Sequence, residues 1–183
     1  STPYKGAKIF YTIDGTEPST SSTEYTSPIT LNIANDPVEV KAVTITSSGK
    51  ASPVVSGSYK KSSLTTSVNP LKIDAGLAVR LFEGNFNTVQ KLGGRPNSNY
   101  VATKVELPEN QPDQFGLVMQ GFINIPADGI YTFYTSSDDG SSLSIGNVLV
   151  VNNDGLHGAQ ERSGEIALKA GYHPILIKYF EAG

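Results

Sequence analysis

Two adjacent aspartates, Asp138 and Asp139, lie in a turn of otherwise small and neutral residues with the sequence SDDGS. Neighbouring carboxylates repel each other unless a cation, a set of hydrogen-bond donors or water screens their charge. A cation would make the turn a metal site, whereas donors would make it a structural turn and water alone would give it no special role. The function of the chain depends on which of the three applies.

No other residues form a pattern that predicts catalysis. The two histidines, His157 and His173, are far apart in the sequence and do not occur in an HxH or HExxH context. The sequence also lacks a GxSxG elbow, a Walker loop and a GxGxxG loop. We therefore predict no catalytic residues, and we interpret His157 as a loop residue and His173 as a strand-edge residue.

The composition narrows the classes of partner. The 183 residues carry a net charge of -3, so no basic face is available to follow phosphates, and neither nucleic acid nor an anionic membrane is an expected partner. The absence of cysteine excludes disulfides, thiolate nucleophiles and cysteine metal sites. The longest apolar runs are far shorter than the roughly 18 residues of a membrane-spanning helix, so no membrane span is predicted.

The chain is predicted to be all-β, with little or no helix. Short runs rich in Val, Ile, Thr, Tyr and Phe alternate with clusters of Gly, Pro, Asn, Asp and Ser. In the first half we predict strands over 29–33 and 38–46, the second with a β-bulge where the apolar pattern changes phase at Ala42–Val43. In the second half we predict strands over 116–125, 130–135, 143–146, 148–151, 164–169 and 173–180. This succession of strands and turns is typical of a β-sandwich.

A polar segment divides the chain into two domains. The sequence KKSSLTTSVNP, residues 60–70, contains few large apolar side chains and ends in proline. We predict a first domain over 1–62, a linker over 63–74 and a second domain over 75–183. Leu64 and Val68 indicate that the linker packs on a neighbouring domain in part.

The first domain carries a recognisable pattern. The segments GAKIFYTIDGTEPSTSSTEYTSPITL and VEVKAVTITSSGKASPVVSGSY resemble the small fibronectin-like domain at the C-terminal side of chitobiases and β-N-acetylhexosaminidases. The resemblance implies that the turn around Asp14 and Glu17 is structural and is not a site. Relative to that family, the leading strand before Ser1 is missing.

The second domain resembles the anthrax-protective-antigen-type β-sandwich of bacterial toxins, glycosidases and fungal adhesins. The resemblance rests on GLAVRLFEGNF, on the long segment from Phe115 to Gly158 that includes SDDGS, and on AGYHPILIKYFEAG. The predicted fold class is thus a small fibronectin/immunoglobulin-like sandwich followed by a larger protective-antigen-like β-sandwich. The resemblance implies a last strand after Gly183, so we expect that both ends of this sequence are trimmed from a longer chain.

The second resemblance implies a specific role for the aspartate pair. In sugar-binding members of the family, two such aspartates are joined by a cis peptide and bind Ca²⁺, which in turn binds sugar hydroxyls. Asp138 and Asp139 match these positions, and Glu181 stands where adhesins have an asparagine ligand. Carboxylate oxygens suit Ca²⁺, so we predict metal ligands at Asp138, Asp139 and Glu181 with carbohydrate bound nearby. The alternative is that the two aspartates only cap a turn by accepting backbone N–H groups.

Three functions remain open. The tandem order of the two domains favours a non-catalytic accessory C-terminal region of a bacterial glycoside hydrolase, in particular a β-N-acetylhexosaminidase. Its expected location is periplasmic, cell-surface or secreted. Its expected partners are a glycan and the catalytic domain of the parent chain. The second reading is a calcium-dependent lectin or adhesin without an enzyme, and the third is a spacer whose ion site has decayed. Such hydrolases use an Asp-Glu pair, and no Asp-Glu dipeptide occurs here, so we expect no hydrolysis of aryl N-acetylglucosaminides by this chain.

Overall fold

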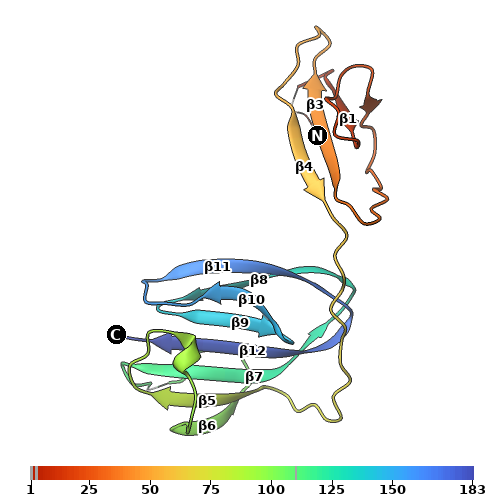
Figure 1. Ribbon diagram of the computed structural model, residues 1–183. Helices are drawn as coiled ribbons and strands as arrows, with labels where there is room; N and C mark the ends of the chain where they lie inside the picture. The colour runs from red at the N-terminus through yellow and green to blue at the C-terminus, as the bar shows by residue number, and fades with distance from the viewer. Residues whose placement is uncertain (1, 3, 110) are drawn as a thin grey trace. The chain divides into compact units, whose positions relative to one another are not determined.

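The computed structural model describes Thr2, residues 4–109 and residues 111–183, and it divides into two compact units at Ser62–Ser63 (Figure 1). The first unit contains β1 (Lys8–Thr12), β2 (Thr23–Glu24), β3 (Val38–Ile45) and β4 (Val55–Tyr59). The second unit contains β5 (Leu77–Glu83), η1 (Val89–Lys91), β6 (Ser98–Ala102), β7 (Phe115–Ile125), β8 (Gly129–Ser137), β9 (Ser141–Ile145), β10 (Val148–Asn153), β11 (Gln160–Leu168) and β12 (Gly171–Glu181). The 3-10 helix η1 is the only helix in these ranges, which confirms the all-β prediction, and no helix there is long and apolar enough to cross a membrane.

The first unit is built on one antiparallel sheet with the strand order β2-β1-β3-β4. The register of β3 is continuous against β1 over Lys41–Ile45 and against β4 over Val38–Ala42, so a bulge within β3 at Ala42–Val43 is wrong. The register shifts by one residue between Ala42 and the bridge from Ile45 to Ala51, and the extra residue lies on the partner segment. The apolar pattern changes phase because both faces of β3 carry apolar residues. Val43 lies opposite Phe10 on one face, where both are buried, while Val40 and Ala42 lie on the other face.

The strand expected over 29–33 is also not formed. Ile29, Leu31 and Ile33 are half-buried and alternate with exposed residues, but the segment belongs to no ladder. Alternating apolar residues therefore mark which side of an extended segment is covered, and they do not by themselves determine strand pairing.

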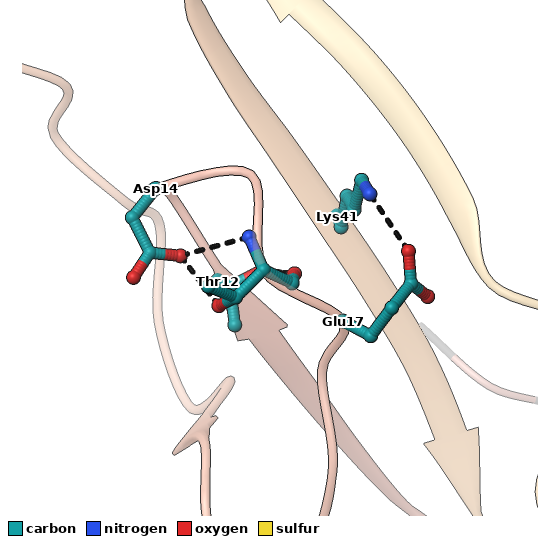
Figure 2. A network of polar contacts seen from close by, with 5 residues as sticks. Thr12, Asp14, Glu17 and Lys41 are labelled. Carbon is teal, nitrogen blue, oxygen red and sulfur yellow. Dashed lines mark hydrogen bonds and ion pairs between the residues drawn. The ribbon is translucent and has the colours of Figure 1, made fainter.

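The turn after β1 is held by local polar contacts (Figure 2). The Asp14 carboxylate accepts hydrogen bonds from the backbone N–H (3.1 Å) and the hydroxyl (2.6 Å) of Thr16, and these bonds hold the pKa of Asp14 below its usual value. The Thr12 hydroxyl donates to the carbonyl oxygen of Thr16 at 2.6 Å. Glu17 forms an ion pair of 2.7 Å with Lys41. Both acidic residues thus contribute to the structure of the turn.

The second unit is a sandwich of unequal sheets. Within the described residues, the larger sheet has the order β10-β9-β12-β7-β5-β6, and the smaller consists of β11 and β8. The main core lies between them and is formed by Val79, Leu81, Phe115, Leu117, Met119, Ile125, Leu143, Ile145, Val151, Ile166, Leu168 and Ile177. The strands predicted for this half are all present as β7 to β12, and most extend one or more residues beyond the predicted ends. The sequence analysis predicted neither β5 nor β6 as a strand. In β6, three of the five residues are exposed and the apolar pattern is short.

The segment predicted as a linker, residues 63–74, falls within the second unit. Thr65 bridges to Leu168, and its backbone N–H donates to the carbonyl oxygen of Ala167 at 2.8 Å. Val68 forms an antiparallel bridge to Tyr172, and its backbone N–H donates to the carbonyl oxygen of Tyr172 at 2.8 Å. The first residues after Ser62 are therefore fixed to the sandwich by backbone hydrogen bonds.

A close approach of two strands requires glycine at position 164. The register of β10 against β9 shifts between Leu149 and Val151, and a Cβ at Gly164 of β11 would lie 1.8 Å from the carbonyl oxygen of Val150. We predict that Gly164→Ala lowers the free energy of unfolding by about 2–3 kcal/mol, because the backbone of β10 or β11 must move. Gly158→Ala is the control, since a Cβ there meets no atom within 4 Å. Equal urea midpoints for both variants would contradict this packing.

Candidate metal and carbohydrate site

Three carboxylates meet at one end of the second unit. Asp138 and Asp139 lie between β8 and β9 and are joined by a cis peptide, and Glu181 is the last residue of β12. One oxygen from each side chain lies within 4.8 Å of the others. The structure thus brings together the three residues that the sequence analysis predicted as metal ligands.

The Asp139 carboxylate is buried and connects two separate segments. One oxygen accepts the backbone N–H of His157 at 2.9 Å, and the other accepts the backbone N–H of Ala182 at 2.9 Å. A buried charge is stable only where such donors replace its water. Asp139 therefore ties the β10–β11 loop to the end of β12.

Asp138 differs from its neighbour in exposure. Its side chain faces solvent, and within the described ranges no donor forms a hydrogen bond with its carboxylate. The backbone carbonyl of Asp138 instead accepts from the Tyr179 hydroxyl at 2.7 Å. The carboxylate of Asp138 therefore remains available to a ligand, whereas that of Asp139 is already fixed in position.

Tyr179 organises the remaining member of the cluster. Its hydroxyl lies 3.1 Å from the Glu181 carboxylate as well as 2.7 Å from the Asp138 carbonyl, so one proton is shared between two acceptors. Burial, and then the hydrogen bond to Glu181, raise the pKa of Tyr179 well above its ordinary value. The hydroxyl thus stays protonated as a donor. The Tyr179 ring packs edge-on against the Phe115 ring, with 5.7 Å between the two ring centroids.

The aspartate turn itself is tightly packed. A Cβ at Gly140 would lie 2.3 Å from the Phe180 ring and 2.9 Å from the backbone nitrogen of Gly155, so only glycine fits at this position. The carbonyl oxygen of Gly140 accepts the N–H of Phe180 at 2.9 Å. Beneath the turn, the buried Asn153 side chain donates to the Ser137 hydroxyl at 3.0 Å. These contacts hold the two carboxylates in one arrangement.

His157 lies in the loop beside the cluster, as predicted, and its ring contacts two backbone carbonyls. Nε2 is 3.0 Å from the oxygen of Asn153, and Nδ1 is 3.0 Å from the oxygen of Gly158. A neutral imidazole donates from only one nitrogen, so both contacts are hydrogen bonds only when the ring is protonated. The bond to Asn153 is the main cause that raises the pKa of His157, and the charges of Asp139 and Asp138 add to it.

The other residues singled out from the sequence lie elsewhere. His173 is buried in β12, where Nε2 bonds the carbonyl oxygen of Lys169 at 2.8 Å. It pairs with β7 and lies before Ile175, where the pairing of β12 with β9 begins. Asp14 and Glu17 belong to the other unit. Tyr179 and Asn153 were missed because a tyrosine or asparagine within a strand has no distinctive sequence pattern.

Chemically, the cluster offers hard oxygen donors and a net negative charge. Two like charges about 4 Å apart repel by about 4 kcal/mol near a protein surface. A divalent cation would relieve this repulsion, and carboxylate oxygens are the ligands that Ca²⁺ and Mg²⁺ prefer.

Comparison with protein families gives two matches that follow one another along the chain. The model of the PA14 domain matches residues 74–183. The model of the chitobiase/beta-hexosaminidase C-terminal domain matches residues 1–56. The aspartate turn and Glu181 both fall within the first of these matches.

Individual proteins resemble the chain in sequence or fold. A beta-hexosaminidase of Porphyromonas gingivalis (strain ATCC BAA-308 / W83) is 30% identical over 183 residues, a match that covers 92% of this chain and 22% of the relative. The PA14 domain of the MpAFP antifreeze protein has a TM-score of 0.54 and 15% identity, over 63% of this chain and 80% of that one. A PA14 sugar-binding domain from an RTX adhesin has a TM-score of 0.51 and 17% identity, and the match covers 60% of this chain and 84% of that one. The two structures establish similarity of fold alone.

The different roles of the two aspartates predict different effects of the same substitution. Asp139→Asn replaces one acceptor oxygen by an amide donor that faces a backbone N–H, so the free energy of unfolding should fall by about 1–3 kcal/mol. Asp138→Asn should change it by less than about 0.5 kcal/mol, since this side chain is exposed. Urea unfolding in buffer with a chelator measures both values. Two variants of equal stability would contradict the anchoring role of Asp139.

The contacts of His157 predict a dependence of stability on pH. Because its pKa in the folded protein is raised above the ordinary value, the stabilisation is fully present below about pH 6.5 and is lost as pH rises through the folded pKa. NMR titration of the imidazole should therefore give a pKa above about 6.5 in chelator-containing buffer. In His157→Gln, the melting temperature should lose this component of its pH dependence. A folded pKa below the ordinary value would contradict the assignment.

Proposed function

Since the chain belongs to the PA14 domain family through residues 74–183, we propose that it is a non-catalytic, carbohydrate-binding accessory region of a glycoside hydrolase of the β-hexosaminidase type. The observation that carries this proposal is the convergence of Asp138, Asp139 and Glu181 on one point at the end of the sandwich. In this proposal the site supplies binding, and the cleavage of glycosidic bonds takes place outside these residues.

The assignment to a hydrolase rests on the relative and on the order of the two domains. The chain spans about 22% of the length of the P. gingivalis beta-hexosaminidase, and the match runs through both units. The first unit matches a domain named for chitobiases and beta-hexosaminidases. Catalysis by the whole protein would then reside outside these residues, and this region would hold a glycan close to the catalytic domain.

The residues present fit a calcium ion. Asp138 presents a carboxylate free of hydrogen bonds from the described residues, and Asp139 is fixed by two backbone donors. The third carboxylate, Glu181, is oriented by the Tyr179 hydroxyl and by the N–H of Gly183 at 3.1 Å. Ca²⁺ takes six to eight oxygen ligands, so these side chains would leave several positions for water. When bound, the ion would supply a positive centre that accepts hydroxyl oxygens.

Carbohydrate recognition would follow from these open positions. Vicinal hydroxyls of a sugar have the spacing to replace two waters on one ion, and the protein's side chains would hold the ion while orienting the ring. Glu181 adds a negative charge where an asparagine would be neutral. The extra charge would strengthen attraction to the cation and would disfavour acidic sugars near the site.

A second candidate function is a calcium-dependent glycan-binding adhesin without an enzyme. One neighbour in fold is described as a PA14 sugar-binding domain from an RTX adhesin, which favours this reading. The same three carboxylates would serve both functions, and only the domains attached to the chain differ. A spacer in which the site binds nothing is the third reading.

Either binding function is consistent with a secreted, periplasmic or cell-surface location. Extracellular calcium modules bind their ion with Kd values of roughly 10⁻⁴ to 10⁻³ M, which suits a site with few protein ligands. The proposed partners are a glycan and, in the hydrolase reading, the catalytic domain of the parent chain.

Calcium titration by calorimetry tests the proposal. The chain should bind Ca²⁺ with Kd of roughly 10⁻⁴ to 10⁻³ M, and Asp138→Asn should weaken binding at least about tenfold while the fold is retained. Glu165→Gln, which removes a carboxylate from β11 outside the cluster, is the control. N-acetylglucosamine oligosaccharides should then bind in calcium and not in chelator. Equal, negligible heats for all three proteins would support the spacer reading and overturn the proposal.

A further inference from the structure

The outer face of the larger sheet, opposite the main core of the second unit, carries positive charge without negative charge. The strand register places two rows of residues across this face: Asn99, Arg80, Val118, Lys178 and Ser142 in one, and Val101, Ala78, Gln120, Leu176 and Ser144 in the next. None of these residues is acidic, although the chain contains 17 acidic residues and has a net charge of -3. The two rows therefore favour an anionic ligand.

Arg80 is the cation at the centre of the three strands β6, β5 and β7. Its side chain is half-buried, and Nη2 donates to the Oε1 atom of Gln120 at 3.2 Å. Nε is buried without a hydrogen-bond partner, and no ion pair to Arg80 is formed within the described ranges. A guanidinium has more donors than this contact uses, so the terminal nitrogens keep N–H groups for an acceptor from outside.

A shallow pocket of about 440 Å³ lies over Arg80, within the range of about 300–1,000 Å³ usual for ligand sites. The exposed amides of Asn99 on β6 and Gln120 on β7 flank it. Because the oxygen of Gln120 already accepts from Arg80, its amide nitrogen is the group left for a ligand. Val101, which is 67% exposed, adds an apolar surface. The lining thus combines hydrogen-bond donors with a small apolar area and contains no carboxylate.

Lys178 adds to the positive potential on this face. It lies in the same row as Arg80, with Val118 between them on β7. Neighbouring strands are about 4.8 Å apart, so the two Cα atoms are separated by about 10 Å. This distance is close to the screening length at physiological ionic strength, so both charges act on an anion bound over Arg80.

We propose that this pocket, the Arg80 pocket, binds the carboxylate of an acidic sugar of the uronate type. The planar guanidinium matches a carboxylate, and the two amides are placed to bind ring hydroxyls while Val101 contacts the apolar face of the ring. The choice of a carboxylate rests on the charges of this face, whereas the choice of a sugar rests on the carbohydrate-binding function proposed above. The acidic cluster disfavours such a sugar, so the two sites would select different residues of one glycan.

Two tetrasaccharides test the proposal. One alternates glucuronate and N-acetylglucosamine, and the other consists of N-acetylglucosamine alone. With the complete 183-residue chain in chelator, so that calcium plays no part, calorimetry should show the acidic tetrasaccharide binding at least about tenfold tighter. Its affinity should fall as salt is added, because the Arg80 pocket is open to solvent.

Matched variants identify the pocket. Arg80→Lys keeps the charge but removes the planar donor group, and it should weaken binding of the acidic tetrasaccharide at least about fivefold. Arg162→Lys, at an exposed position outside the lining, is its control. Asn99→Asp at an exposed position should fold normally and weaken binding at least about tenfold through charge repulsion, with the exposed Asn147→Asp as its control.

Three results would overturn the proposal: equal affinity or no binding for the two tetrasaccharides, equal effects of a variant and its control, or equally tight binding of an acidic peptide of the same charge. The last result would indicate a protein partner recognised by charge. Asp138→Asn should leave binding of the acidic tetrasaccharide unchanged, since Asp138 lies outside the Arg80 pocket. Failure of this proposal is therefore distinguishable from failure of the calcium site.

Discussion

The buried carboxylate of Asp139 is the interaction on which the end of the second unit depends. It joins the N–H of His157 to the N–H of Ala182, two positions that are separate in the sequence and lie on different segments. A charge this buried is stable only with such donors, so the loop and the end of β12 must keep their positions for the turn to exist. The exposed Asp138 and the terminal Glu181 are brought together as a consequence.

The long strand β12 provides the second part of this arrangement. It pairs with β7 over its whole length and with β9 from Ile175 to Tyr179, so the register of the central sheet determines where the Tyr179 hydroxyl points. The ring of Tyr179 contacts Phe115 in the core, while its hydroxyl contacts Asp138 and Glu181. One residue thus connects the packing of the core to the geometry of the acidic cluster.

The sequence predicted the parts of this structure that leave a local pattern. Adjacent carboxylates in a glycine turn and runs of β-branched residues are such patterns, and they led to Asp138, Asp139 and most strands of the second unit. Pairing depends on distant segments, which explains the failures: 29–33 alternates without joining a ladder, and β3 keeps a continuous register against β1. Tyr179 was not found for the same reason, because its role arises from three-dimensional contacts.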